Sequence, residues 1–538
     1  GAVGGNVYKH LLMFNYRGDP NGRHNLPGKP MLDFVSSTLF VLGLAYSLYR
    51  WREPCYFLLV IWFGVMLCGG VFSLPFEAPQ SLRAIGTLPV AYVLTCVPLA
   101  LMERESRRAL GHLGERAFIM ALLPFLAFVG WDNYNVYFNM QARDFAVWNS
   151  FSTRETIIAR EANRLGHGYD IYLAPTLTNH LTTRFLAPDF KEHLVLEPTT
   201  ALPLRRSGRQ GVALFVDPDS AGTRALIESY YPHAAIKEFR SPYDGPATLY
   251  VYLLTPDDVE RVQGLPARYY RGEGADIAPL YRQGEVLDFN WRDETPLPLP
   301  FHAEWMGTLL APAYGQYSLS FEAPGQVELW LDGVSLLTGS GKVTRAVTLA
   351  KGLHALRIRC TVAEPGPLRL RWQPPEADDL TVIPREALYR PPVTANGLLG
   401  SYYRNDEWAE PPAFVRIDPR VDFYFHLIPL SRPYTVEWQG QIDIPATGTY
   451  RLGTEVLDAC WLYIDGELLL ENLQPNHYQE ATIDLTAGRH DIRLRFLDRT
   501  DHSHVYLYWT PPDGVKEIVP HERLFPPERG AWTEAEGR

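Results

Sequence analysis

The sequence predicts a multidomain protein: an α-helical transmembrane bundle of about four helices, then a small α/β domain and two tandem all-β sandwiches. Three observations lead to this prediction. Long apolar stretches are confined to the first quarter of the 538 residues. Helical and strand patterns alternate in the following 120 residues or so, which is typical of a sheet with crossing helices. The last half carries one ordered set of motifs twice, which indicates two copies of one module.

The first region, residues 1–140, is predicted to be the transmembrane region. Its apolar stretches run over about 32–49, 55–74, 85–101 and 117–131. A helix of about 20 apolar residues crosses the hydrocarbon layer and satisfies its own backbone polar groups. The fourth stretch contains Pro124, yet no charged residue lies between Phe118 and Trp131. We therefore expect it to span, with a buried amphipathic hairpin as the alternative.

The distribution of arginines predicts an orientation. Arg50 and Arg52 follow the first stretch, and a longer basic loop over 104–116 follows the third. Short basic loops stay in the cytoplasm. The chain is thus expected to be a multi-pass protein of the cell membrane with its C-terminal domains extracytoplasmic. The first 30 residues are polar and rich in Gly and Pro, which predicts a loop, and we expect a longer protein to precede them.

Composition excludes several classes of function. The formal net charge is −11 and basic residues form no long block, so nucleic acid is not expected as a partner. The five cysteines are scattered and show no CxxC or Cys/His spacing, so no metal site or other cofactor is predicted. His502 and His504, with Asp498 and Asp501, suit a polar loop better than a metal site.

Residues 141–258 are predicted to form the α/β domain. Helical spacing covers Ser152–Leu165 and Ala221–Tyr230. Short apolar runs, expected to be strands, cover Ile171–Leu173, Leu194–Leu196, Val212–Val216 and Ala247–Leu254. No glycine-rich nucleotide motif accompanies them.

The repeated modules are predicted at 264–390 and 394–527. Glu304-Trp305 recurs as Glu437-Trp438, and Asp332-Gly333 as Asp465-Gly466, both 133 residues later. An Asp-Gly pair between apolar runs predicts a tight hairpin, since that turn needs positive φ. Many short alternating strands between Gly- and Pro-containing turns predict a β-sandwich in each copy.

These modules resemble the protective-antigen-type (PA-14) β-sandwich. The resemblance rests on Gly-Leu-x-x-x-Tyr-Tyr, Glu-Trp, Gly-x-Tyr, the Asp-Gly hairpin, Gly-x-His and Trp-x-Pro-Pro, in that order in both copies. It implies carbohydrate binding, for which Asp458 and Asp465 are the candidates, or else a structural or docking role. Lectin members hold Ca²⁺ with an Asp-Asp pair, whereas here Leu457-Asp458 and Pro324-Gly325 stand there, so Ca²⁺ is not expected. Trp305 and Trp438 suit the core better than a sugar platform.

Residues 1–140 resemble the C-terminal spans of polytopic GT-C glycosyltransferases, the dolichyl-phosphate-mannose mannosyltransferase-like enzymes. The motifs are Phe14–Pro20 through Asn25–Gly28, and Phe76-Glu77-Ala78-Pro79 with Arg83 and Pro89. The resemblance implies transfer of a sugar from a polyprenyl-phosphate donor. The family's catalytic carboxylate lies in a loop absent here, so the catalytic residue stays unknown.

Arg83, Glu77 and Arg17 are the candidates for binding the lipid phosphate. A guanidinium binds phosphate through two parallel hydrogen bonds, which suits Arg83 at an outer membrane boundary. The alternative interpretation is that Arg83 is an interfacial anchor whose side chain reaches the lipid headgroups. Glu77 pairs with Arg83, orients an acceptor or merely belongs to the loop.

The first hypothesis is therefore that the chain is the C-terminal part of a glycosyltransferase that acts on an extracytoplasmic acceptor. It would be an enzyme only together with the missing N-terminal part. The alternative is a non-catalytic, membrane-anchored adhesin or assembly subunit that displays two glycan-binding or structural sandwiches. The expected partners are the lipid bilayer, a polyprenyl-phosphate sugar, and glycans or cell-surface proteins.

Overall fold

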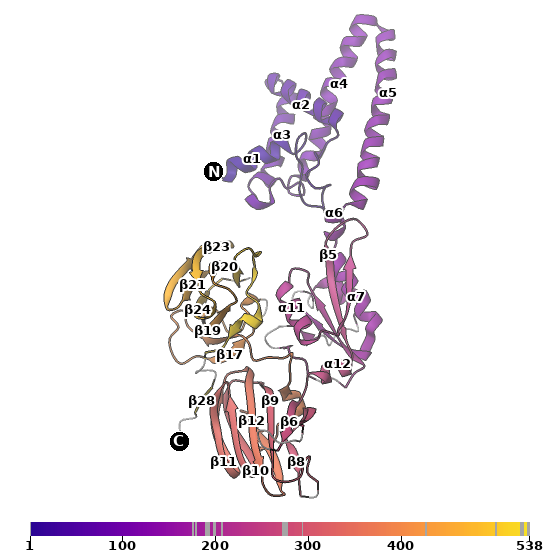
Figure 1. Cartoon of the computed structure of the whole chain (residues 1–538). Helices are drawn as coiled ribbons and strands as arrows, with labels where there is room; N and C mark the ends of the chain where they lie inside the picture. The colour runs from indigo at the N-terminus through magenta and orange to yellow at the C-terminus, as the bar shows by residue number, and fades with distance from the viewer. Residues whose placement is uncertain are drawn as a thin grey trace. The chain divides into compact units, whose positions relative to one another are not determined.

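The computed structural model describes residues 2–174, 177, 180–188, 194–196, 201–205, 208–271, 278–292, 294–425, 428–500, 503–527 and 532–534. The chain folds into two compact units (Figure 1). One comprises Gly1–Ala159 with Phe239–Thr248, and the other Arg160–Glu238 with Leu249–Arg538. Each is described separately.

The first unit is helical. Its long helices are α1 (Ala2–Leu12), α2 (Phe34–Tyr49), α3 (Pro54–Val71), α4 (Leu88–Leu110) and α5 (His112–Tyr134). Asp33 starts α2 by accepting hydrogen bonds from the backbone N–H groups of Val35 and Ser36. Pro54 starts α3, where its missing N–H costs nothing. Figure 1 shows α4 and α5 as a long hairpin.

Within the described part of the chain, three helical segments are long and apolar enough to cross a membrane: Pro54–Val71, Ile85–Leu110 and His112–Arg143. The helix Phe34–Tyr49 is apolar but has only 16 residues. The predicted basic loop over 104–116 is wrong, because α4 continues to Leu110 and the chain turns only at Gly111, with φ 56°. Arg, Glu and Ala are strong helix formers, so charge alone does not end a helix there.

The loop predicted for the first 30 residues is also wrong over Ala2–Leu12. Asn6 donates from Nδ2 to the carbonyl oxygens of Val71 (2.9 Å) and Ser73 (3.0 Å), at the end of α3. His10 accepts a hydrogen bond at Nε2 from the backbone N–H of Gln80, at 3.0 Å. Both side chains are buried, so long-range polar contacts hold a helix that the local sequence did not predict.

A five-stranded mixed sheet follows, in the order β2-β1-β3-β5-β4. The strands are β1 (Tyr169–Leu173), β2 (Leu194–Val195), β3 (Gly211–Val216), β4 (Ala235–Arg240) and β5 (Ala247–Leu254). Strand β1 runs parallel to β2 and β3, and β5 is antiparallel to β3. Helices α11 (Ala221–Tyr230) and α12 (Pro256–Arg261) follow β3 and β5.

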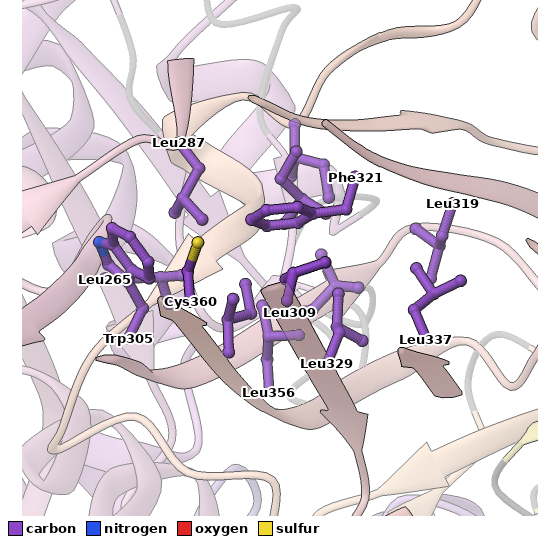
Figure 2. Close-up of a cluster of buried hydrophobic side chains, with 14 of the residues drawn as sticks. Leu265, Leu287, Trp305, Leu309, Leu319, Phe321, Leu329, Leu337, Leu356 and Cys360 are labelled. Carbon is purple, nitrogen blue, oxygen red and sulfur yellow. The ribbon is translucent and has the colours of Figure 1, made fainter. Parts of the chain in front are cut away.

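The first repeated module is a β-structure around one apolar core (Figure 2). Its main strands are β6 (Leu265–Tyr270), β7 (Leu280–Glu285), β8 (Asp288–Asn290), β9 (Phe301–Ala311), β10 (Gly315–Leu331), β11 (Val334–Leu349), β12 (Gly352–Val362) and β13 (Pro367–Gln373). Strand β10 pairs with β13 over its first half and with β12 over its second. Figure 2 shows Trp305, Phe321 and Leu329 in the core.

The second module has two sheets, ordered β17-β16-β19-β24-β21-β22 and β18-β25-β20-β23, with a buried core. The first sheet contains β16 (Leu398–Tyr403), β17 (Phe414–Asp418), β19 (Tyr434–Ile444), β21 (Ala459–Ile464), β22 (Glu467–Asn472) and β24 (Gly488–Asp498). The other contains β18 (Asp422–Tyr424), β20 (Gly448–Val456), β23 (His477–Leu485) and β25 (His504–Thr510). Sheets facing each other across a core make a β-sandwich.

Candidate functional site

The predicted carbohydrate residue Asp465 lies in a hairpin turn, with φ 49°. Its carboxylate accepts hydrogen bonds from the backbone N–H of Asp491 (3.0 Å) and lies 2.7 Å from Nδ1 of His490. Asp332 in the first module makes the same contacts with Ala355 (2.8 Å) and His354 (2.7 Å). The pair therefore fastens a hairpin to the next strand in both modules.

The second candidate, Asp458, lies between β20 and β21. It accepts hydrogen bonds from the backbone N–H groups of Arg499 (2.7 Å) and Thr500 (2.9 Å), and from the hydroxyl of Thr500 (2.7 Å). At the matching point of the first module, Pro324 and Gly325 lie in a bulge of the unbroken strand β10. Asp458 thus stabilises a neighbouring turn of its own module.

Trp305 and Trp438 are fully buried. The indole N–H of Trp438 donates to Asp418 at 2.7 Å, and that of Trp305 donates to Glu285 at 3.0 Å. Both rings therefore belong to the cores and present no surface to a sugar.

An outward row of aromatic side chains crosses the sheet of β18, β25, β20 and β23. Successive side chains of a strand point to opposite faces. Val505, Leu507 and Trp509 of β25 lie in the core, so the alternate positions face outward. We call this row the aromatic face. It consists of Tyr424, Tyr478, Tyr506 and Tyr508, which are exposed or partly exposed, and of His504, which is only 6% exposed.

The rings of the aromatic face form a continuous series. The Tyr424 and His504 rings are stacked with centroids 6.0 Å apart, and the His504 and Tyr506 rings are stacked at 5.3 Å. Tyr506 lies 6.2 Å from Tyr508, which contacts Tyr478 edge-on at 5.4 Å. Tyr424 is 41% exposed, so its ring is open to solvent.

Polar groups border the aromatic face. Burial first, and then the charges of Glu455 and Asp422, raise the pKa of Tyr508 to about 12, so its hydroxyl stays protonated at neutral pH. The ammonium of Lys516 lies 3.9 Å from the ring centroid of Tyr478. On the other side Gly222 of α11 covers Asp422, since a Cβ on that glycine would lie 1.9 Å from Oδ2. Aromatic rings with neighbouring donors and acceptors suit a sugar, which has both C–H faces and hydroxyls.

The equivalent surface of the first module has a different chemistry. In β13, Leu368, Leu370 and Trp372 lie in the core, so Arg369 and Arg371 face outward where the second module has Tyr506 and Tyr508. Arg369 donates to Asp288 at 3.0 Å. The two modules thus share their cores and differ on this face.

Sequence reasoning missed the aromatic face. The signal was present: His504-x-Tyr506-x-Tyr508 alternates directly before the repeated Trp509, and Pro367-x-Arg369-x-Arg371 stands before Trp372. A comparison of the outward positions of the two copies, after the repeat was aligned, identifies it.

The hairpin histidines predict a pH dependence of stability. Burial lowers the pKa of His354, but the Asp332 carboxylate and the Ala350 carbonyl oxygen raise it more, and the net pKa is raised. The pKa of His490 is raised by its hydrogen bond to Asp465 despite partial burial. A histidine whose pKa is higher in the folded than in the unfolded protein stabilises the fold when it is protonated. This stabilisation is fully present below the pKa of the unfolded state, about 6.5, and is lost as the pH rises through the pKa of the folded state.

We therefore expect the unfolding temperature of the modules to fall as the pH rises above about 6.5. A His354→Gln/His490→Gln variant should show a shallower fall, because the linked protons are gone. His477→Gln, at an exposed position of β23, is the matched control. Scanning calorimetry of the whole chain between pH 5 and pH 9 measures the slope, and an unchanged slope in the double variant would contradict the assignment.

The residues predicted to bind a lipid phosphate are partly brought together. Nη2 of Arg83 lies 3.1 Å from Oε2 of Glu77, so these two form an ion pair. Arg17 lies beside Gly28, whose Cβ position is 3.8 Å from its Nε. Asp19 joins the two loops, since its buried carboxylate accepts hydrogen bonds from the backbone N–H (2.8 Å) and the hydroxyl (2.7 Å) of Ser81.

The part of the chain that the structure describes holds no group of three or more His, Cys, Asp or Glu side chains able to bind a metal ion. Asp501 and His502, considered above for a metal site, lie outside the described residues. Of that set, His504 belongs to the aromatic face. Asp498 is buried and accepts a hydrogen bond from Arg432 at 2.7 Å.

Comparisons with known proteins match the repeated modules. The model of the PA14 domain matches residues 284–385 and 394–523. The anti-sigma-I factor RsgI3 of Acetivibrio thermocellus is 26% identical over 294 residues, covering 49% of this chain and 44% of that relative. The chain thus spans less than half of the length of this curated relative.

Two solved structures show the range of similar chains. An anti-sigma factor domain-containing protein from Clostridium clariflavum is 23% identical, with a TM-score of 0.23, over 49% of this chain and 99% of that one. A PA14 sugar-binding domain from an RTX adhesin is 15% identical, with a TM-score of 0.22, over 24% of this chain and 99% of that one. Scores this low do not establish a common overall structure.

These findings contradict the glycosyltransferase hypothesis, because the curated relative is an anti-sigma factor and the matched family model is the PA14 domain. They favour the alternative of a non-catalytic protein. The resemblance of residues 1–140 to GT-C enzymes is not supported, and with it a polyprenyl-phosphate sugar loses its basis as a partner. The resemblance of the modules is confirmed: the chain contains two tandem PA14 domains.

Proposed function

We propose that this protein is a non-catalytic, membrane-anchored protein that presents two PA14 domains outside the cell and binds a glycan on the aromatic face of the second. The observation that carries the proposal is the difference between the two domains. They keep the same core Trp residues and the same hairpin contacts, yet among the described residues the series of stacked rings lies on the second domain, where the first has Arg369 and Arg371.

Stacking on the aromatic face would supply the affinity. A sugar ring has an apolar C–H face that covers an aromatic ring, and partly buried rings lose little side-chain entropy on binding. The hydroxyls of Tyr506 and Tyr508 supply hydrogen-bond donors for a sugar. The carboxylate of Glu455, which is opposite Tyr506 on the neighbouring strand β20, supplies an acceptor. A series of rings along a sheet suits several linked sugars better than a single one.

Membrane anchoring is supported by the apolar helices. The most apolar 18-residue stretch within His112–Arg143 has a mean hydropathy of 1.6, yet only 6% of it is buried inside the protein. Exposed apolar surface of this extent is unfavourable in water and favourable in lipid. Orientation follows from the basic residues near Gly111, which favour the cytoplasmic side for that turn.

The test is glycan binding by the whole chain in detergent or nanodiscs. We expect a glycan array to give binders and a Tyr506→Ala/Tyr508→Ala variant to lose them. Truncation of central aromatic residues costs at least about 2 kcal/mol, which is about a 30-fold increase in Kd. Isothermal titration with the best binder measures the change.

The first PA14 domain provides the matched control. Arg369→Ala/Arg371→Ala alters the equivalent outward positions there and should leave the Kd unchanged. Retention of full affinity by the tyrosine variant, with loss in the arginine variant, would contradict the assignment to the second domain. Failure of every glycan on the array would contradict glycan binding itself.

The match to an anti-sigma factor favours a second candidate, in which glycan binding outside the membrane is a regulatory signal. The two candidates differ in one observable. A sensor changes transcription in the producing organism when its glycan is added, and the tyrosine variant abolishes that change. A simple adhesin gives no transcriptional response.

A further inference from the structure

A pocket of about 430 Å³ lies within the second unit, between the α/β sheet domain and the first PA14 domain. This volume is in the range of small-molecule sites. Rings and other apolar groups form much of its wall, with arginines at its edge. The lining residues include Pro232, Asp258, Arg261, Gln283, Arg390, Pro391 and Pro392.

Main-chain hydrogen bonds fix the walls of this pocket to each other. The backbone N–H of Gly264 donates to the carbonyl oxygen of Leu388 at 2.7 Å, and that of Arg390 donates to Val262 at 2.9 Å. Tyr389 is fully buried in the apolar core that also contains residues of the α/β sheet. The pocket is therefore built by the fold rather than left between loosely joined parts.

The guanidinium of Arg390 bonds only to neutral acceptors among the hydrogen bonds of the described residues. Its Nε donates to the carbonyl oxygen of Arg261, and its Nη1 donates to Oε1 of Gln283 at 2.8 Å. Asp258 is the one carboxylate among the lining residues, and it lies 3.9 Å from Nη2 of Arg261. Asp258 also accepts hydrogen bonds from the backbone N–H (2.9 Å) and hydroxyl (2.7 Å) of Thr255, which cap α12.

A third arginine adds positive charge beside the pocket. The pKa of Arg390 is lowered, chiefly by burial and also by the positive charges of Arg385 and Arg261, which repel its guanidinium. Arg385 lies over the backbone of Gly284, where a Cβ would be 2.9 Å from its Nη2. Like charges gathered at a pocket edge favour an anion, which relieves the repulsion.

We propose that this pocket binds a sugar-sized molecule carrying one oxyanion group, a carboxylate or a phosphate. The oxyanion lies at Arg261 and Arg390, and the ring of the ligand covers the exposed prolines Pro232, Pro391 and Pro392. This site is distinct from the aromatic face and does not depend on the proposed glycan binding there.

The experiment is titration calorimetry on the whole chain with four probes. Glucuronate and glucose 6-phosphate carry the two oxyanions on one ring, glucose is the neutral match, and inorganic phosphate is the anion without a ring. We expect at least one charged sugar to bind at least tenfold more tightly than both glucose and inorganic phosphate. The preferred charged sugar identifies the oxyanion, and raising the salt concentration should weaken its binding.

Arg261→Gln/Arg390→Gln should raise the Kd of the preferred charged sugar at least tenfold. Arg369→Gln, on the outward face of the first PA14 domain, is the control and should leave it unchanged. The single variant Arg261→Gln, whose side chain is 51% exposed, tests the same point without disturbing the bonds of Arg390. The tyrosine variant of the aromatic face should bind this ligand normally, which separates failure of the two proposals.

Two results would overturn the proposal. One is binding of glucose or inorganic phosphate as tight as that of both charged sugars. The other is an unchanged Kd in both arginine variants while their unfolding temperatures match that of the original chain.

Discussion

Replacement of Asp418 by Ala is expected to lower the free energy of unfolding of the second PA14 domain by about 3–5 kcal/mol, because it leaves a buried charge without its partner. Asp418 is fully buried, and the Arg416 side chain beside it is only 8% exposed. Oδ1 of Asp418 accepts a hydrogen bond from Nε of Arg416 at 2.5 Å. Water cannot reach the buried Arg416 guanidinium to replace the lost carboxylate.

Two neutral donors depend on the same carboxylate. Oδ2 of Asp418 accepts hydrogen bonds from the hydroxyl of Tyr402 at 2.6 Å and from the indole of Trp438 at 2.7 Å. Burial chiefly, with Asp418 adding to it, raises the pKa of Tyr402 well above its usual range, so the phenol remains a donor. Removal of Asp418 therefore leaves these donors in the core without an acceptor.

The first PA14 domain offers the matched control. Glu285 accepts hydrogen bonds from Tyr269 (2.6 Å) and Trp305 (3.0 Å), but the neighbouring Arg282 is 50% exposed at its side chain. Water can solvate that guanidinium, so Glu285→Ala should cost about 1–3 kcal/mol. Hydrogen exchange of the backbone amides in β16 and β19, against those in β6 and β9, localises each effect. Equal loss of protection in the two variants would contradict the distinction.

The sequence predicted those parts of the fold that the two copies share. Glu-Trp, Asp-Gly and the closing Trp recur because they serve the core and the hairpins, and the structure places Trp305, Trp438, Asp332 and Asp465 there. Carbohydrate binding by Asp465 stays a prediction, and the contacts that its carboxylate makes with His490 and Asp491 recur at Asp332 in the first module.

The glycan-binding surface proposed above lies where the two copies differ. Tyr506 and Tyr508 stand where the first module has Arg369 and Arg371, and this difference has no consequence for either core. Outward positions become visible only when the pleat of each strand is known, since a shift of one residue exchanges the two faces. The pocket at Arg390 was beyond prediction because it depends on contacts between residues over 120 positions apart.

The helical region shows the limits of local patterns. Hydropathy identified the apolar helices, but Asn6 and His10 bind groups of residues 71–80 and hold a helix where the sequence predicted a loop. Similarly, α4 extends through its charged end to Gly111, because helix propensity there outweighs the polarity from which a loop was predicted.

A membrane anchor that presents the PA14 domains outside places two exposed positions on opposite sides of the membrane. Val515 of the second PA14 domain is 79% exposed, and His112, next to Gly111, has a side chain that is 90% exposed. We expect Val515→Cys to face the exterior and His112→Cys to face the cytoplasm. Cys360 and Cys460 are buried and contribute no background, and the unsubstituted chain measures that of Cys55, Cys68 and Cys96.

Labelling of intact cells with a membrane-impermeant thiol reagent is the most direct test of the central claim, that a membrane anchor presents the PA14 domains outside. We expect Val515→Cys to react in intact cells and His112→Cys to react only after permeabilisation. Reaction of His112→Cys in intact cells, with Val515→Cys protected until permeabilisation, would contradict it.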